Sequence, residues 1–88
     1  MNVAIVLEHL ALALALESDP RRGAQLAGYA EAVCKRDGFE REFTEQTTHT
    51  RLESRLRETL TPDELAQLTT QGESLTADDA IALALQDP

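Results

Sequence analysis

The hydrophobic and polar positions of this chain divide it into five stretches, and the first is the most apolar. Residues 3–17 are interrupted only by Glu8, His9 and Glu17. The alternation of Ala and Leu over 11–16 also fits a strand, but both are strong helix formers and the length of the stretch favours a helix. A helix that is apolar on every side is normally buried on every side, but the rest of so short a chain can bury only part of it.

A second helix is predicted over 20–37, antiparallel to the first because the connection at 18–19 is short. Asp19 suits the N-cap, and Pro20 suits the first turn, where its missing N–H costs nothing. Gly38 suits the left-handed residue that ends a helix. One face of this helix carries mostly small residues, which favour close packing on the first helix. They are Gly23, Leu26, Ala27, Ala30, Val33 and Cys34.

The pattern is weakest over 39–50, which is rich in threonine, a mediocre helix former. Phe39 and Phe43, four residues apart, are placed to dock onto the hairpin. A third helix is clear over 51–60, and its start is left open from Thr44 onward. Its apolar stripe at a spacing of four consists of Leu52, Leu56 and Leu60.

Two capping signals open the last two helices. Thr61 and Glu64 form a capping box around Pro62, so a fourth helix begins there. Gly72 is expected to end that helix. Thr76 opens a fifth helix in the same manner, with acidic residues in its first turn.

Composition supports one all-α domain. The chain has 88 residues, 42% hydrophobic and only 3% aromatic, so its core is built from Ala and Leu rather than from the residues that strands favour. We predict a single helical domain over 1–88, with a helical hairpin at 1–38 and capping helices at 39–88. The antiparallel hairpins form either a tetratricopeptide-like array or a small bundle.

The net charge limits which binding partners are expected, and the cysteine content indicates the cellular compartment. Eight basic and sixteen acidic residues give a net charge of -8, and from Glu58 to Pro88 every charged residue is acidic. Nucleic acid and anionic membrane surfaces are therefore disfavoured as partners. The single cysteine, Cys34, excludes a disulfide within the chain and fits a cytoplasmic setting. The apolar run 3–16 lacks the basic start of a signal peptide and is shorter than the ~20 residues that span a bilayer.

No catalytic or cofactor-binding constellation is recognisable. The glycines at 23, 28, 38 and 72 stand alone, so there is no phosphate-binding loop. We interpret His9 as a histidine at a packing edge. His49 is expected to face solvent or to cap packing. Cys34, on an apolar helix face, is expected to behave as a small hydrophobic residue.

Two pairs of charged residues could bind a metal ion or an anion. Asp78 and Asp79 occupy the first turn of a helix, where acidic residues are expected without a metal. Arg51 and Arg55, one turn apart, could hold a carboxylate or phosphate, but the neighbouring glutamates favour an ordinary solvated face. We predict no catalytic residue, no cofactor and no metal.

The first two helices resemble a tetratricopeptide-type hairpin, of which one unit spans ~34 residues and about three are needed for stability. The residues that carry this resemblance are Leu10, Ala11 and Leu14 in the first helix and Gly23, Ala27 and Ala30 in the second.

The C-terminal half, with Leu60-Thr-Pro-Asp-Glu-Leu and then Gly72 to Leu85, resembles the tail of large bacterial regulators. These proteins join a signal-transduction ATPase core to a tetratricopeptide-like tail, and carry either a LuxR-type or winged-helix DNA-binding domain or an adenylate cyclase domain. Thr61, Leu65 and Thr69 stand where glycine, phenylalanine and tryptophan are usual, so the fourth helix has a lighter core. The resemblance implies the end piece of a longer regulator, or a free-standing gene cut down from one.

These observations favour a non-enzymatic helical interaction module that offers a surface to a protein partner or to domains of its parent chain. The expected surface consists of Val3, Val6, Leu10 and Leu14. An isolated chain is expected to form a homo-oligomer, most simply a twofold dimer through the first helix. Two alternatives stay open: the regulatory tail of an enzyme such as an adenylate cyclase-linked ATPase, and a free-standing acidic protein that binds a basic partner.

Overall fold

The computed structural model describes residues 3–17, 19–38 and 43–86, except for the side chains of Val3, Phe43 and Thr44. These residues form five helices and no strand, which confirms the predicted all-α class. The helices are α1 (Val3–Glu17), α2 (Pro20–Asp37), α3 (Phe43–Thr59), α4 (Pro62–Glu73) and α5 (Ala77–Ala84). Among the described helices, none combines the length and the apolar character needed to cross a lipid bilayer.

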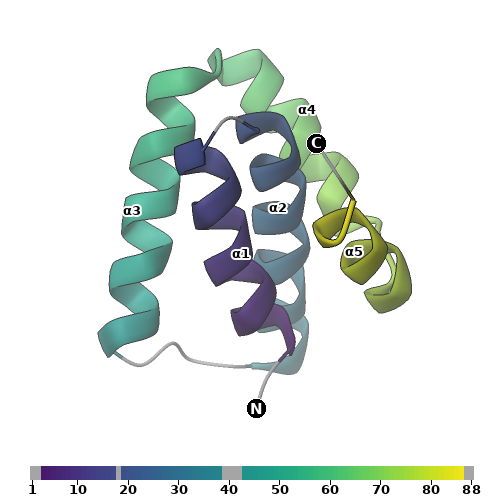
Figure 1. Cartoon of the computed structure of the whole chain (residues 1–88). Helices are drawn as coiled ribbons and strands as arrows, with labels where there is room; N and C mark the ends of the chain where they lie inside the picture. Colours follow the sequence, from purple (N-terminus) through teal and green to yellow (C-terminus); the bar gives the residue numbers. More distant parts are fainter. Residues whose placement is uncertain (1–2, 18, 39–42, 87–88) are drawn as a thin grey trace.

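The helices form a compact bundle around a central antiparallel pair, α1 and α2 (Figure 1). Helix α3 packs mainly on α1, and α4 packs on the other side of the pair, against α2. Helix α5 is the shortest and leans on both α1 and α2. The order α3–α1–α2–α4 therefore leaves one side of α1 without a neighbouring helix (Figure 1).

The starts of α2, α4 and α5 and the end of α2 lie where the capping residues predicted them. Asp19 Oδ1 accepts a first-turn backbone N–H at 3.1 Å, and Gly38 adopts the left-handed conformation with φ 65°. Thr61 and Glu64 form the reciprocal capping box, with side chain to backbone distances of 3.1 and 3.2 Å. Thr76 Oγ1 caps α5 at 3.1 Å. These contacts are local, so they follow directly from the sequence.

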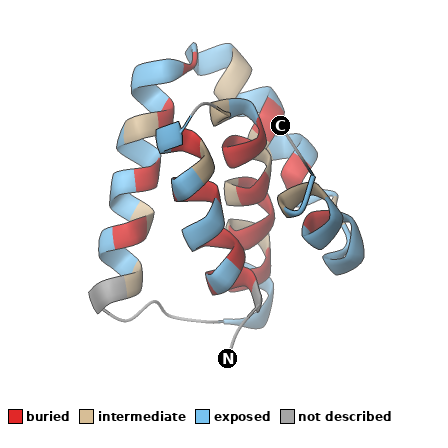
Figure 2. Ribbon diagram, in the orientation of Figure 1, coloured by how far each residue is buried: buried red, intermediate tan, exposed pale blue. Residues whose placement is uncertain are grey.

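The core consists mainly of leucine and alanine, with Tyr29 and Val33 of α2 among them, and the buried positions lie where the helices face one another (Figure 2). Leu26 of α2 and Leu52 and Leu56 of α3 are fully buried, and Leu60 is buried beside them. The predicted leucine stripe of the third helix is thereby confirmed as its inward face.

Glycines allow the helix axes to approach closely. A Cβ at Gly23 would lie 2.9 Å from the backbone oxygen of Ala11 in α1. Where α2 crosses α4, a Cβ at Gly28 would collide with the carbonyl group of Thr69, and one at Gly72 with that of Gln25. The prediction that Gly72 ends the fourth helix is wrong, because it is a buried residue inside α4 that permits this crossing.

Helix α3 also begins earlier than predicted, at Phe43 rather than from Thr44 onward. Thr48 is buried, and its Oγ1 lies 3.2 Å from His9 Nδ1 of α1. Packing against α1 thus outweighs the low helix propensity of the threonines. The predicted docking of Phe39 and Phe43 concerns side chains outside the described residues.

A buried arginine fastens the end of α5 to the start of α2. Arg22 is 6% exposed and pairs with Asp19 at 3.1 Å. Its Nη1 donates to the backbone oxygens of Leu83 at 3.1 Å and Gln86 at 2.5 Å. A guanidinium at a helix C-terminus satisfies carbonyl groups that have no partner within the helix.

Candidate functional site

The structure presents two candidate sites, and the first is the uncovered side of α1. Val6 and Leu10 are each 39% exposed and Leu16 is 47% exposed, with the exposed Ala13 between them. We call these four residues the outward face of α1. Exposed positions alternate with buried ones along this helix (Figure 2). Three large apolar side chains at helical spacing on one exposed stripe are typical of a protein contact surface.

The expected interaction surface only partly coincides with the outward face. Val6 and Leu10 are on it. Leu14 is half-buried and packs against the core, so it is not on the exposed stripe. The side chain of Val3 is outside the described residues, and Leu16 joins the face although it was not predicted. The helix is therefore covered on one side and open on the other.

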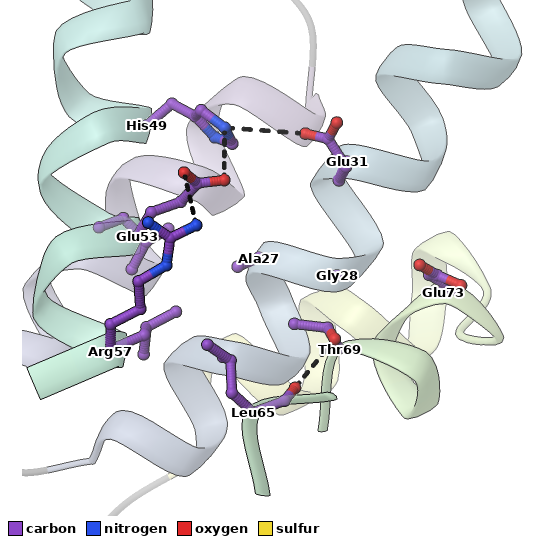
Figure 3. A pocket seen from close by; sticks show the side chains of 11 residues that line it. Ala27, Gly28, Glu31, His49, Glu53, Arg57, Leu65, Thr69 and Glu73 are labelled. Carbon is purple, nitrogen blue, oxygen red and sulfur yellow. Dashed lines mark hydrogen bonds and ion pairs between the residues drawn. The ribbon is translucent and has the colours of Figure 1, made fainter. Parts of the chain in front are cut away.

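The second candidate site is a pocket of about 270 Å³ between α2, α3 and α4 (Figure 3). Its lining residues are Ala27, Gly28, Glu31, His49, Leu52, Glu53, Leu56, Arg57, Leu65, Thr69 and Glu73. Helix α2 supplies small residues, so the pocket is open where larger side chains would fill it. The inner part is apolar and the charged side chains lie around it.

His49 lies at the centre of a carboxylate cluster in this pocket. Its Nδ1 is 3.0 Å from Oε2 of Glu8, a residue of α1 that is 1% exposed. Its Nε2 is 3.1 Å from Glu53 Oε1 of its own helix and 4.0 Å from Glu31 Oε2 of α2. The imidazole thus links three helices. Of the two expectations for His49, solvent exposure is wrong, since only 17% of its side chain is exposed.

The remaining polar groups of the pocket are arranged around the same opening. Glu31 points from α2 toward His49, while Glu53 and Arg57 reach in from α3 (Figure 3). Arg57 Nη2 lies 3.9 Å from Glu53 Oε2, one turn away. Thr69 Oγ1 donates to a backbone oxygen of its own helix at 2.9 Å. Of the side chains that the structure describes around this opening, more are carboxylates than guanidinium groups.

Asp78, Asp79, Cys34 and His9 lie in separate surroundings in the structure. Within 3–17, 19–38 and 43–86, no three His, Cys, Asp or Glu side chains are placed to hold a metal ion. Asp78 and Asp79 are exposed in the first turn of α5. Cys34 is buried, and His9 lies at the surface beside Thr48. A reactive thiolate requires access and a nearby positive charge, and a buried position on an apolar face favours neither.

The two arginines considered for anion binding have separate surroundings. Arg55 Nε donates to the backbone oxygen of Ala15 at 3.4 Å, and its Nη1 pairs with Glu58 at 3.8 Å. Arg51 is exposed on the same helix. Arg55 therefore helps to hold α3 on α1.

Sequence reasoning missed the cluster around His49. The available signal was Glu8, a charged residue in the middle of an otherwise apolar helix. A buried carboxylate requires hydrogen-bonding partners, so its presence predicts a polar group on a packed neighbour. The sequence does not show which neighbour, since 41 positions separate Glu8 from His49.

Comparison with known proteins identifies no relative: no family model, no curated protein and no solved structure matches the chain.

Proposed function

We propose that this chain is a non-enzymatic helical module that binds protein through the outward face of α1. The observation that supports this proposal is the exposure of Val6, Leu10 and Leu16 on the most apolar helix of the chain. The other sides of α1 pack against α2, α3 and α5, so the open side is the one available to a partner.

For the isolated chain, we propose a second copy as the occupant of this face. The net charge of -8 makes two copies repel each other over most of their surfaces. The four residues of the outward face carry no charge, and the exposed His9 and Glu17 lie beside them on the same side of the helix. A twofold axis brings one patch against an identical patch, which suits an uncharged apolar stripe.

In a longer protein, the same face would pack against neighbouring helices of the parent chain. Terminal units of helical arrays combine one apolar face with a polar outer face. The acidic α4 and α5 would supply that outer face at the end of a cytoplasmic bacterial regulator. This part of the proposal rests on the resemblance to tetratricopeptide-like tails. The residues encoded before Met1 would test it, since a nucleotide-binding sequence there supports the parent-chain reading.

Sedimentation equilibrium of the pure chain tests the proposed dimer. We expect a dimer at high micromolar concentration, and a dissociation constant at least about tenfold larger for Leu10→Glu, because the new carboxylate must lose water on association. Leu16→Glu is expected to act in the same direction. A monomeric wild type at high micromolar concentration would contradict the proposal.

The matched control is Leu85→Glu, which makes the same chemical change at a leucine directly after α5 that is 73% exposed. It is expected to leave the dissociation constant unchanged. Far-ultraviolet circular dichroism of each variant verifies that the helices are retained. Equal weakening by Leu10→Glu and Leu85→Glu would show that added charge, not the outward face, controls association.

A further inference from the structure

The pocket between α2, α3 and α4 combines two chemically different parts. Its inner surface is apolar and comes from Ala27, Gly28, Leu52, Leu56 and Leu65. Three carboxylates stand around it, one from each helix: Glu31, Glu53 and Glu73. We infer that this pocket receives a lysine or arginine side chain of a partner protein.

The charge of the pocket favours a cationic occupant. Among the described lining residues, Arg57 carries the one guanidinium, and it already lies 3.9 Å from Glu53. Glu31 and Glu53 share the imidazole of His49 between them, at 4.0 and 3.1 Å. Glu73 is in no ion pair with another residue of the described ranges. Among the described lining residues, three carboxylates therefore stand against one guanidinium, and a second cation would be attracted.

Size and surface chemistry select the kind of cation. At about 270 Å³, the pocket is below the range of about 300–1,000 Å³ typical of sites for drug-sized ligands, so one side chain fits it better than a large molecule. Lysine and arginine bury an aliphatic stem on apolar surface and keep the charged head among polar groups. The apolar floor beneath a carboxylate rim matches that division.

The net charge of the whole chain favours a basic protein as the partner. Its net charge of -8 attracts a basic protein over a distance and repels nucleic acid. The pocket shares no residue with the outward face of α1. Each site can therefore bind, or fail to bind, without the other.

Nuclear magnetic resonance titration of the full chain with a lysine hexapeptide tests this inference. We expect saturable shifts concentrated on the backbone amides of the lining residues in α2, α3 and α4. Glu31→Gln and Glu73→Gln should each weaken binding about five-fold, the effect of losing one partly exposed ion pair. Glu58→Gln, which removes the same charge from the last turn of α3 outside the pocket, should leave affinity nearly unchanged.

A second probe separates a pocket from a merely acidic surface. A hexapeptide of 2,4-diaminobutyrate carries the same charges on shorter stems, so it should bind more weakly than the lysine peptide if the apolar floor contributes. Equal binding of the two peptides, or equal effects of Glu31→Gln and Glu58→Gln, would overturn the inference. Binding of spermine without binding of the lysine peptide would also overturn it, because the occupant would then be a small polyamine. Leu10→Glu should leave these titrations unchanged, which distinguishes this test from that of the α1 dimer.

Discussion

At the scale of single residues, the two histidines have unequal structural roles. His49 contacts a carboxylate that is almost fully buried, whereas His9 is exposed and contacts a threonine hydroxyl. We expect His49→Ala to lower the free energy of unfolding by about 2 kcal/mol, because Glu8 then loses a buried partner. His9→Ala should cost only about 0.5 kcal/mol. Urea denaturation of both variants measures the difference, and equal losses would contradict the assigned role of Glu8.

The glycines of the α2–α4 crossing provide a second test at this scale. Gly28→Ala and Gly72→Ala would each place a methyl group against backbone of the facing helix. Overpacking of this kind costs roughly 1–3 kcal/mol. The neighbour is backbone and cannot rotate away, so we expect a net loss of about 2 kcal/mol even though alanine is the better helix former by about 1 kcal/mol.

The control for this pair is Ala66→Gly, the reverse change at an exposed position of α4. It should cost about 1 kcal/mol through helix propensity alone. A gain in stability on Gly28→Ala or Gly72→Ala, measured by urea denaturation, would show that the two helices lie further apart than described here.

At the scale of helices, the capping box of α4 should be visible in an acid titration. The Thr61 backbone N–H, and then the Arg21 guanidinium at 2.6 Å, hold the pKa of Glu64 below its usual value. Because the folded pKa is lowered, the contribution of this carboxylate is present above its unfolded pKa. It is lost as the pH falls through the folded pKa.

Carbon-detected nuclear magnetic resonance of the Glu64 carboxyl group measures this pKa directly. We expect Arg21→Gln to raise the pKa of Glu64 while leaving it below the usual value, since the Thr61 N–H remains. Arg36→Gln, at an exposed arginine paired with Asp37, should leave it unchanged. An unaltered pKa in Arg21→Gln would mean that Arg21 and Glu64 are not paired in solution.

Helix boundaries show which parts of the fold could be predicted from sequence. The starts of α2, α4 and α5 depend on contacts within four residues, and a capping residue reveals them. The threonine-rich first part of α3 carries no such local signal, and its buried Thr48 contacts His9, 39 positions away. Gly72 was misread for the same reason, because its role is defined by Gln25 of another helix. The sequence therefore predicts local caps and the α1–α2 hairpin with its short connection, but not the contacts between helices distant in the chain.

At the scale of the whole molecule, the five helices share one core and should unfold together. Tyr29 is the only tyrosine, the chain has no tryptophan, and Tyr29 is 6% exposed in α2. We expect its fluorescence and the far-ultraviolet circular dichroism to change at the same urea concentration. A lower midpoint for Tyr29 would show that part of the bundle separates before the rest.

The candidate sites were predictable to different degrees at this scale. The composition of α1 predicts that part of its apolar surface stays exposed, because the rest of so short a chain cannot cover every side of it. The positions at which α3 and α5 pack on α1 determine which side of α1 stays exposed. They therefore also determine that Leu16 is exposed and Leu14 is not. The pocket was not predicted, since its rim collects residues from three helices.

The hydrogen atom that stands in place of a side chain at Gly28 has a double effect. The residue permits the contact with Thr69 and also forms part of the floor of the pocket. A mutation there would alter the anchoring of α4 and the width of the cavity at once. A change at this single position therefore couples the packing of the bundle to the shape of the cavity, so neither can be adjusted there without the other.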